Sequence, residues 1–106
     1  MTLPREAVLN LIQEHVAEDW RTFVHGMERS MDMLERDIRQ AASTREDCTA
    51  AWRDAIEHVI EDLSSHLFAI SEPRFSSESD SRNLRALKRR LRELYARYKT
   101  ISAATA

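Results

Sequence analysis

Three histidines in this sequence are each followed three residues later by a glutamate, a spacing that could hold a metal ion. The pairs are His15 with Glu18, His25 with Glu28, and His58 with Glu61. Residues three apart share one side of a helix. Di-iron helical bundles, however, place the glutamate before the histidine and add further inward-facing glutamates, and His25 points nearly opposite the apolar stripe of its own helix. We therefore expect solvated histidines beside glutamates and no metal site, and we keep a metal-binding helical bundle as the last-ranked alternative.

His66 differs from these three because the helical periodicity places it within an apolar arc, with Asp62 one turn earlier. We expect a histidine at the edge of the core that is hydrogen-bonded to the carboxylate of Asp62. The functional alternative is that His66 and Asp62 form a pH-sensitive pair, because an imidazole can gain charge between about pH 5 and pH 8.

Cys48 is the only cysteine. It stands in the first turns of the second expected helix, where the helix dipole favours a thiolate, but no histidine is fixed beside it in sequence. The chain also contains no glycine-rich phosphate loop, no Gly-x-Ser-x-Gly elbow and no Cys-x-x-Cys pair. We therefore expect no enzymatic activity and no cofactor, and the single thiol fits a reducing compartment.

The composition predicts an all-α protein. One glycine and two prolines in 106 residues leave little material for turns. Ala, Glu, Lys, Leu and Arg together make up close to half of the chain, a share typical of long helices and coiled coils. Sandwiches, barrels and doubly wound sheets are thereby excluded. The length predicts a single all-helical domain over residues 1–106.

An apolar spacing that repeats every eleven residues predicts the first helix, over about 4–42. The repeat runs through Leu9, Ile12 and Val16, then Trp20, Phe23 and Met27, then Met31, Leu34 and Ile38. Eleven residues make three helical turns, so the stripe stays nearly parallel to the axis. Gly26 lies within this stretch and costs about 1 kcal/mol relative to alanine. Because the phase continues through it, we expect one unbroken helix, with Thr2 as its N-cap and Pro4 in its first turn.

Two further helices are expected. The segment Ser43-Thr44-Arg45-Glu46 fits a capping box, which predicts a second helix over about 44–71 that Pro73 ends. The serine-rich residues 72–81 are expected to form a flexible linker. A third helix is expected over about 82–101, capped by Ser79, Asp80 or Ser81, with residues 102–106 frayed. Its apolar positions are Leu84, Leu87, Leu91, Leu94, Tyr98 and Ile101.

The lengths of these helices predict an uncovered stripe. The short connection between the first two helices predicts a long antiparallel helical hairpin. A stripe of about 38 residues cannot be covered by a helix of about 27 residues alone. Either the third helix folds back to make a three-helix bundle, or two chains pair in a dimeric helical bundle. We expect a homodimer. On the helical wheel, Phe68 projects roughly opposite the apolar arc of the second helix.

The charge is distributed very unevenly along the chain. Residues 1–81 carry 8 basic and 17 acidic side chains, whereas residues 82–106 carry 8 basic and 1 acidic. Most of the cations of the third helix share one side, which we call the basic face: Arg82, Arg85, Lys88, Arg89, Arg92 and Lys99. Arg90 and Arg97 lie on the other flank of the leucine stripe. The basic face could track nucleic-acid phosphates, dock on the acidic helices of its own chain or a second copy, bind another acidic protein, or contact a membrane surface.

These patterns together predict the class of the protein. We expect a third basic amphipathic helix that docks on the hairpin or on a second chain. The start of the chain lacks the apolar core of a signal peptide and no apolar run could span a bilayer, so we expect a cytoplasmic protein without a transmembrane segment. The expected function is a non-catalytic protein–protein interaction module, acting as an adaptor, regulator or assembly subunit. The first alternative is a nucleic-acid-associated regulator that uses the basic face.

Overall fold

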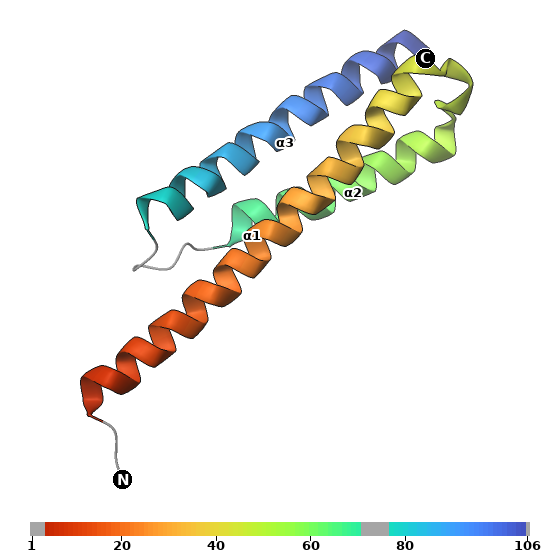
Figure 1. The fold of residues 1–106 in the computed structure, drawn as a ribbon. Coiled ribbons are helices and arrows are strands. Elements are labelled where there is room, and N and C mark those ends of the chain that lie inside the picture. Colours follow the sequence, from red (N-terminus) through yellow and green to blue (C-terminus); the bar gives the residue numbers. More distant parts are fainter. Residues whose placement is uncertain (1–3, 71–76, 106) are drawn as a thin grey trace.

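A computed structural model describes residues 4–70 and 77–105, and within these ranges the chain is all-α. The element order is α1 (Arg5–Ser43), a short 3-10 turn η1 (Arg45–Asp47), α2 (Ala50–Ala69) and α3 (Glu78–Thr105), with no strand in the described ranges. Figure 1 shows α1 and α3 running in the same direction and α2 running opposite to both. The all-α prediction is confirmed.

Helix α1 is a single rod of 39 residues that continues through Gly26. No residue in the described ranges has a positive φ, and Gly26 therefore keeps ordinary helical geometry. Its predicted bounds are confirmed to within one residue. Pro4 precedes the helix as the N-cap residue, and its carbonyl accepts the backbone N–H of Val8 at 3.1 Å. The predicted cap, Thr2, lies outside the described residues.

The predicted start of the second helix was wrong. Ser43 is still part of α1, where its hydroxyl donates to the Gln40 carbonyl at 2.8 Å, and Glu46 lies in η1 rather than in a capping box. Helix α2 instead begins at Ala50, and the Thr49 hydroxyl accepts the Trp52 N–H at 3.1 Å. Because η1 continues the turn after α1, the reversal of the chain is completed six residues later than the box predicted.

Cys48 consequently lies in the connection between α1 and α2, not in the first turns of a helix. Its side chain is buried, and the thiol donates to the Ala41 carbonyl at 3.4 Å. A buried thiol held by a backbone carbonyl packs as a small apolar side chain.

Helix α3 is longer than predicted at both ends. It begins at Glu78 instead of residue 82, because the Ser77 hydroxyl accepts the N–H of Asp80 at 3.1 Å and so satisfies one free donor of the first turn. Acidic Glu78 and Asp80 in that turn also suit the positive end of the helix dipole. The helix continues to Thr105, so the expected fraying from residue 102 is wrong. The rest of the predicted linker, including Pro73, falls in the segment 71–76, outside the described residues.

The core forms where α3 folds back on the hairpin of its own chain. Helix α3 packs against both α1 and α2. Each helix contributes a fully buried side chain to the same cluster: Met31 from α1, Leu67 from α2 and Tyr98 from α3. The third helix therefore completes a three-helix bundle within one chain, which is one of the two arrangements that the helix lengths allowed.

Candidate functional site

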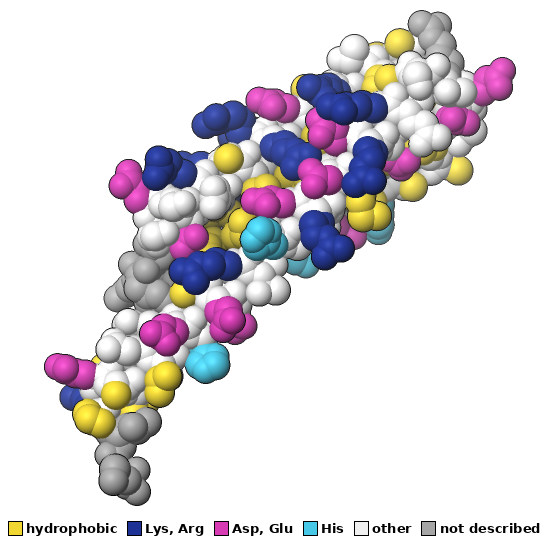
Figure 2. Space-filling view, viewed as in Figure 1, with side chains coloured by type: hydrophobic (Ala, Val, Ile, Leu, Met, Phe, Trp, Pro, Cys, Tyr) yellow, Lys and Arg dark blue, Asp and Glu magenta, His cyan; other side chains and the backbone are white. Residues whose placement is uncertain are grey.

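The first turns of α1 extend beyond the bundle, and we call residues 5–19 the N-terminal arm. Figure 1 shows this segment projecting past the ends of α2 and α3. Five large apolar side chains on the arm keep between 39% and 55% of their surface exposed. They are Val8, Leu9, Leu11, Ile12 and Val16. Trp20, the next residue of the repeat, is the first that is buried in the core. Figure 2 shows apolar side chains gathered toward this end of the molecule.

The exposure of the arm follows from the lengths of the helices. At 1.5 Å per residue, the 39 residues of α1 span about 58 Å, whereas the 20 residues of α2 span about 30 Å and the 28 of α3 about 42 Å. Because α2 and α3 pack against the C-terminal part of α1, neither of them is long enough to reach its first turns as well. The stripe of Leu9, Ile12 and Val16 therefore continues past the last helix able to cover it.

A second uncovered apolar region lies between α1 and α2, and we call it the α1–α2 groove. Its volume is about 390 Å³. The lining residues are Ser30, Met33, Leu34, Asp37, Ile56 and Val59. Met33 keeps 68% of its surface exposed, although methionine is an apolar side chain. Because α3 packs against both other helices, α1 and α2 are held on either side of it and their own seam remains open.

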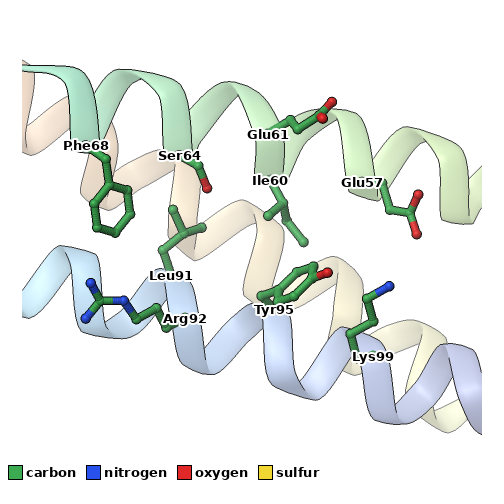
Figure 3. A pocket seen from close by; sticks show the side chains of 9 residues that line it. All are labelled: Glu57, Ile60, Glu61, Ser64, Phe68, Leu91, Arg92, Tyr95 and Lys99. Carbon is green, nitrogen blue, oxygen red and sulfur yellow. The ribbon is translucent and has the colours of Figure 1, made fainter.

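A third depression, the α2–α3 groove, has a volume of about 460 Å³ and is drawn in Figure 3. Its apolar floor includes Ile60 from α2 and Leu91 from α3, and Arg92 and Lys99 stand on its α3 side. Figure 3 shows Phe68 pointing from α2 toward α3. The sequence placed this ring opposite the apolar arc of its helix, and the ring keeps 46% of its surface exposed although it lines the α2–α3 groove.

Cations hold the Phe68 ring at that position. The Lys88 ammonium lies 5.3 Å and the Arg92 guanidinium 5.2 Å from the ring centroid. Further along α3, the Lys99 ammonium lies 5.4 Å from the centroid of Tyr95. A cation over an aromatic face at this distance is attracted by the ring quadrupole. A helical wheel gives the direction of a side chain on its own helix and cannot include this attraction from a neighbour.

The basic face is therefore divided into two parts. Lys88, Arg92 and Lys99 lie over aromatic rings of their own chain, and of these only Lys88 is half-buried. Arg82, Arg85 and Arg89 are exposed and have no such contact with a described ring. None of the six makes an ion pair with a described residue.

The flank of α3 opposite the basic face is joined to α1 by ion pairs, whose individual partners the sequence did not identify. Arg90 Nη2 lies 2.7 Å from Asp32 Oδ1 and 3.0 Å from Glu35 Oε2, and Arg97 Nη1 lies 3.4 Å from Glu35 Oε1. The hydrogen bond from Arg90 lowers the pKa of Glu35 despite partial burial. The spacing of these residues could have indicated the contact. Asp32 and Glu35 are three residues apart and Arg90 and Arg97 are seven apart, so each pair lies on one side of its own helix.

Tyr98 adds a polar contact inside the core. Its hydroxyl donates to Glu57 Oε1 at 2.9 Å, and it lies 3.3 Å from the Arg53 carbonyl oxygen. Burial, with the nearby Glu57 carboxylate, raises the pKa of the Tyr98 hydroxyl. The contact joins the C-terminal half of α3 to the first turns of α2.

The histidines lie on the surface. His66 is exposed, and its Nδ1 lies 2.7 Å from the backbone carbonyl oxygen of Asp62, so the expected bond to the carboxylate is replaced by one to the backbone. His25 Nδ1 lies 3.6 Å from Glu28 Oε2 on an exposed part of α1. Among the described residues, no three His, Cys, Asp or Glu side chains are grouped so that they could hold a metal ion. Of the three His-x-x-Glu pairs, His25 with Glu28 is thus one whose two side chains come together.

Comparison of the chain with protein-family models, with curated proteins and with solved structures gives no match. Of the helices in the described ranges, none combines the length and the apolar character needed to cross a bilayer. The arm, the two grooves and the exposed arginines are the surface features that could contact another molecule.

Proposed function

We propose that this protein is a non-catalytic helical interaction module that associates with a second copy of itself through the N-terminal arm. The observation that carries the proposal is the arm's exposed apolar side chains on a helix that extends past the rest of the bundle. A contiguous apolar surface on a small domain is costly in water, and it is commonly a contact surface for another protein.

The physical chemistry of the arm favours a helical partner. Its apolar residues continue the eleven-residue repeat that packs Met31, Leu34 and Ile38 into the core, so the arm presents a stripe already shaped for helix packing. The arm also carries Glu6, Glu14, Glu18 and Asp19 against a single Arg5, and this charge opposes contact with phosphates or anionic lipids. A protein surface with apolar and basic positions suits it better than a nucleic acid or a membrane.

The test is the molar mass in solution at tens of micromolar protein, measured by light scattering after size-exclusion chromatography. We expect a species of twice 12.3 kDa. The variant Leu9→Ala/Ile12→Ala should weaken association about 100-fold or more, because truncation removes about 1 kcal/mol per half-exposed aliphatic side chain and four are lost per dimer. The matched control is Asn10→Ala/Gln13→Ala, which changes two exposed polar residues of the same turns and should leave the mass unchanged. A monomeric wild-type protein would refute the proposal.

A second candidate is nucleic-acid binding through the basic face, favoured by the exposed side chains of Arg82, Arg85 and Arg89, which make no ion pair with any described residue. Such binding would weaken steeply with salt, because each neutralised phosphate releases counterions. The variant Arg85→Ala/Arg89→Ala/Arg92→Ala should then lose retention on a mixed-sequence DNA or RNA column. Absence of wild-type retention at low salt would exclude this candidate and would leave the first one untouched.

A further inference from the structure

We infer that the arm of each copy docks in the α1–α2 groove of the other, with the two α1 helices antiparallel, so that each bundle gains a fourth helix from its partner. The inference rests on the proposed function and adds to it the receiving surface and the orientation. It arises from three features of α1: an uncovered face along its whole length, a register that matches arm to groove, and complementary charges on one flank.

The uncovered face is a single line of residues along α1. At about 100° per residue, its members fall within about 45° of a common direction. They are Val8, Ile12, His15, Asp19, Thr22, Gly26, Ser30, Met33 and Asp37, and every one is exposed or half-buried. Because α3 and the core lie on other sides of the rod, this face is free from the arm to the groove.

The register follows from where the apolar residues lie on that face. The arm is centred near residue 12, and the part of the groove contributed by α1 runs from Ser30 to Asp37. Antiparallel pairing about a two-fold axis near Thr22 places the arm of one copy opposite this segment of the other. The same axis places the second arm in the second groove, so the contact is isologous and closes as a dimer.

The crossing point has small side chains, which lets the two rods approach. Thr22 and Gly26 lie on the uncovered face beside the two-fold axis. A Cβ placed on Gly26 would meet no described atom within 4 Å beyond its chain neighbours and the backbone of its own helical turns, so the surface there is open. Side chains are thus small from Thr22 to Gly26, Asp19 lies one turn before the axis, and the large apolar residues Ile12 and Met33 lie toward the two ends.

Charges on one flank of the face complement each other only in the antiparallel orientation. In antiparallel helices like flanks meet, and Glu18 shares a flank with Arg29 and Arg36, all within about 80° of the centre of the uncovered face, whereas Glu14 lies about 120° from it. In this register Glu18 of one copy lies within one turn of Arg29 of the other, and Arg36 lies two turns further along. Neither arginine makes an ion pair with a described residue, whereas the nearby acidic Asp32 and Glu35 are already bound to Arg90.

The test is a charge swap between the two halves of α1. Variant A is Glu14→Arg/Glu18→Arg and variant B is Arg29→Glu/Arg36→Glu, and all four positions are exposed. Each variant alone should associate about 10-fold or more weakly than wild type, because like charges then face each other. Mixing A with B restores opposite charges at both contacts, so we expect an A–B heterodimer of near wild-type affinity, measured by sedimentation with one variant fluorescently labelled.

The matched control is Arg85→Glu/Arg89→Glu on α3, which changes the net charge by the same amount as variant B and should not affect dimerisation. If wild type is dimeric but variant B remains as tightly associated as wild type, the arm pairs elsewhere and this inference is overturned while the proposed function stands. Two weakened variants that do not combine on mixing would overturn it as well. A monomeric wild type would overturn both.

Discussion

Replacing Arg90 by methionine should measurably weaken the contact between α3 and α1. Arg90 bridges Asp32 and Glu35 at 2.7 and 3.0 Å, with side-chain exposures of 29% for Arg90 and 25% for Glu35. A fully exposed ion pair contributes about 0.2–1 kcal/mol, and a hydrogen bond to a charged group about 1.5–3 kcal/mol. A partly covered bridge lies between these limits. We expect Arg90→Met to cost about 1.5 kcal/mol, which lowers the Tm of a domain of this size by roughly 6–12 °C.

The coupling between Arg90 and Glu35 should also depend on pH with a defined sign. The hydrogen bond from Arg90 lowers the pKa of Glu35 below its ordinary value of 4.5. A lowered pKa in the folded state stabilises the protein above the unfolded-state value and loses that contribution as the pH falls through the folded-state value. The pKa of Arg90 is raised, so the arginine stays charged throughout this range. The difference in the free energy of unfolding between wild type and Arg90→Met should therefore be constant from pH 6 to 8 and become smaller below about pH 4.

The assay is a double-mutant cycle with Arg90→Met and Glu35→Gln, followed by urea unfolding with circular dichroism. We expect a coupling energy of about 1 kcal/mol at pH 7. The control is Arg39→Met, since Arg39 reaches Glu35 Oε1 at 3.3 Å but is 70% exposed, and it should cost less than about 0.5 kcal/mol. A coupling energy below about 0.3 kcal/mol, or one that grows in acid, would refute the reasoning.

Three further substitutions test other contacts. Tyr98→Phe should destabilise the bundle by about 1–2 kcal/mol, because the hydroxyl bonded to Glu57 is lost from a buried ring, and an unchanged urea midpoint would contradict this. Gly26→Ala should raise the helix stability by about 0.5–1 kcal/mol when unfolding is measured at concentrations too low for association, because the added methyl group meets open space. Phe68→Leu should lower the free energy of unfolding of wild type by about 0.5–1 kcal/mol more than it lowers that of a Lys88→Met/Arg92→Met variant. The reason is that the cation–π contacts are present only when both the ring and the cations are there.

The sequence predicted those properties of the fold that depend on neighbouring residues. The eleven-residue repeat predicted that α1 would continue through Gly26, because the cost of one glycine is small beside the packing of Met31, Leu34 and Ile38. The leucine spacing predicted the buried side of α3. Helix ends were predicted less well. Ser43 and Thr49 both suit an N-cap, and the turn η1 between them decided which was used.

The candidate surfaces could be predicted only in part. The basic face was visible in the sequence, but the placement of some of its cations over the rings of Phe68 and Tyr95 was not. His66 was expected to bond the Asp62 carboxylate and instead contacts the backbone. Arg90 was placed on the other flank of the leucine stripe, but its partners Asp32 and Glu35 were not identified. In each case the deciding atom belongs to another turn or another helix, and a wheel drawn for one helix does not contain it.

Sequence alone therefore determined that this chain forms long amphipathic helices and which side of each is apolar, because both properties follow from residues a few positions apart. Tertiary structure decided which parts of each apolar side are covered. Leu9, Ile12 and Val16 repeat the spacing of Met31, Leu34 and Ile38, yet the first set is exposed and the second is buried. The spacing is the same, and the difference lies in the lengths and positions of α2 and α3, which end before the arm begins.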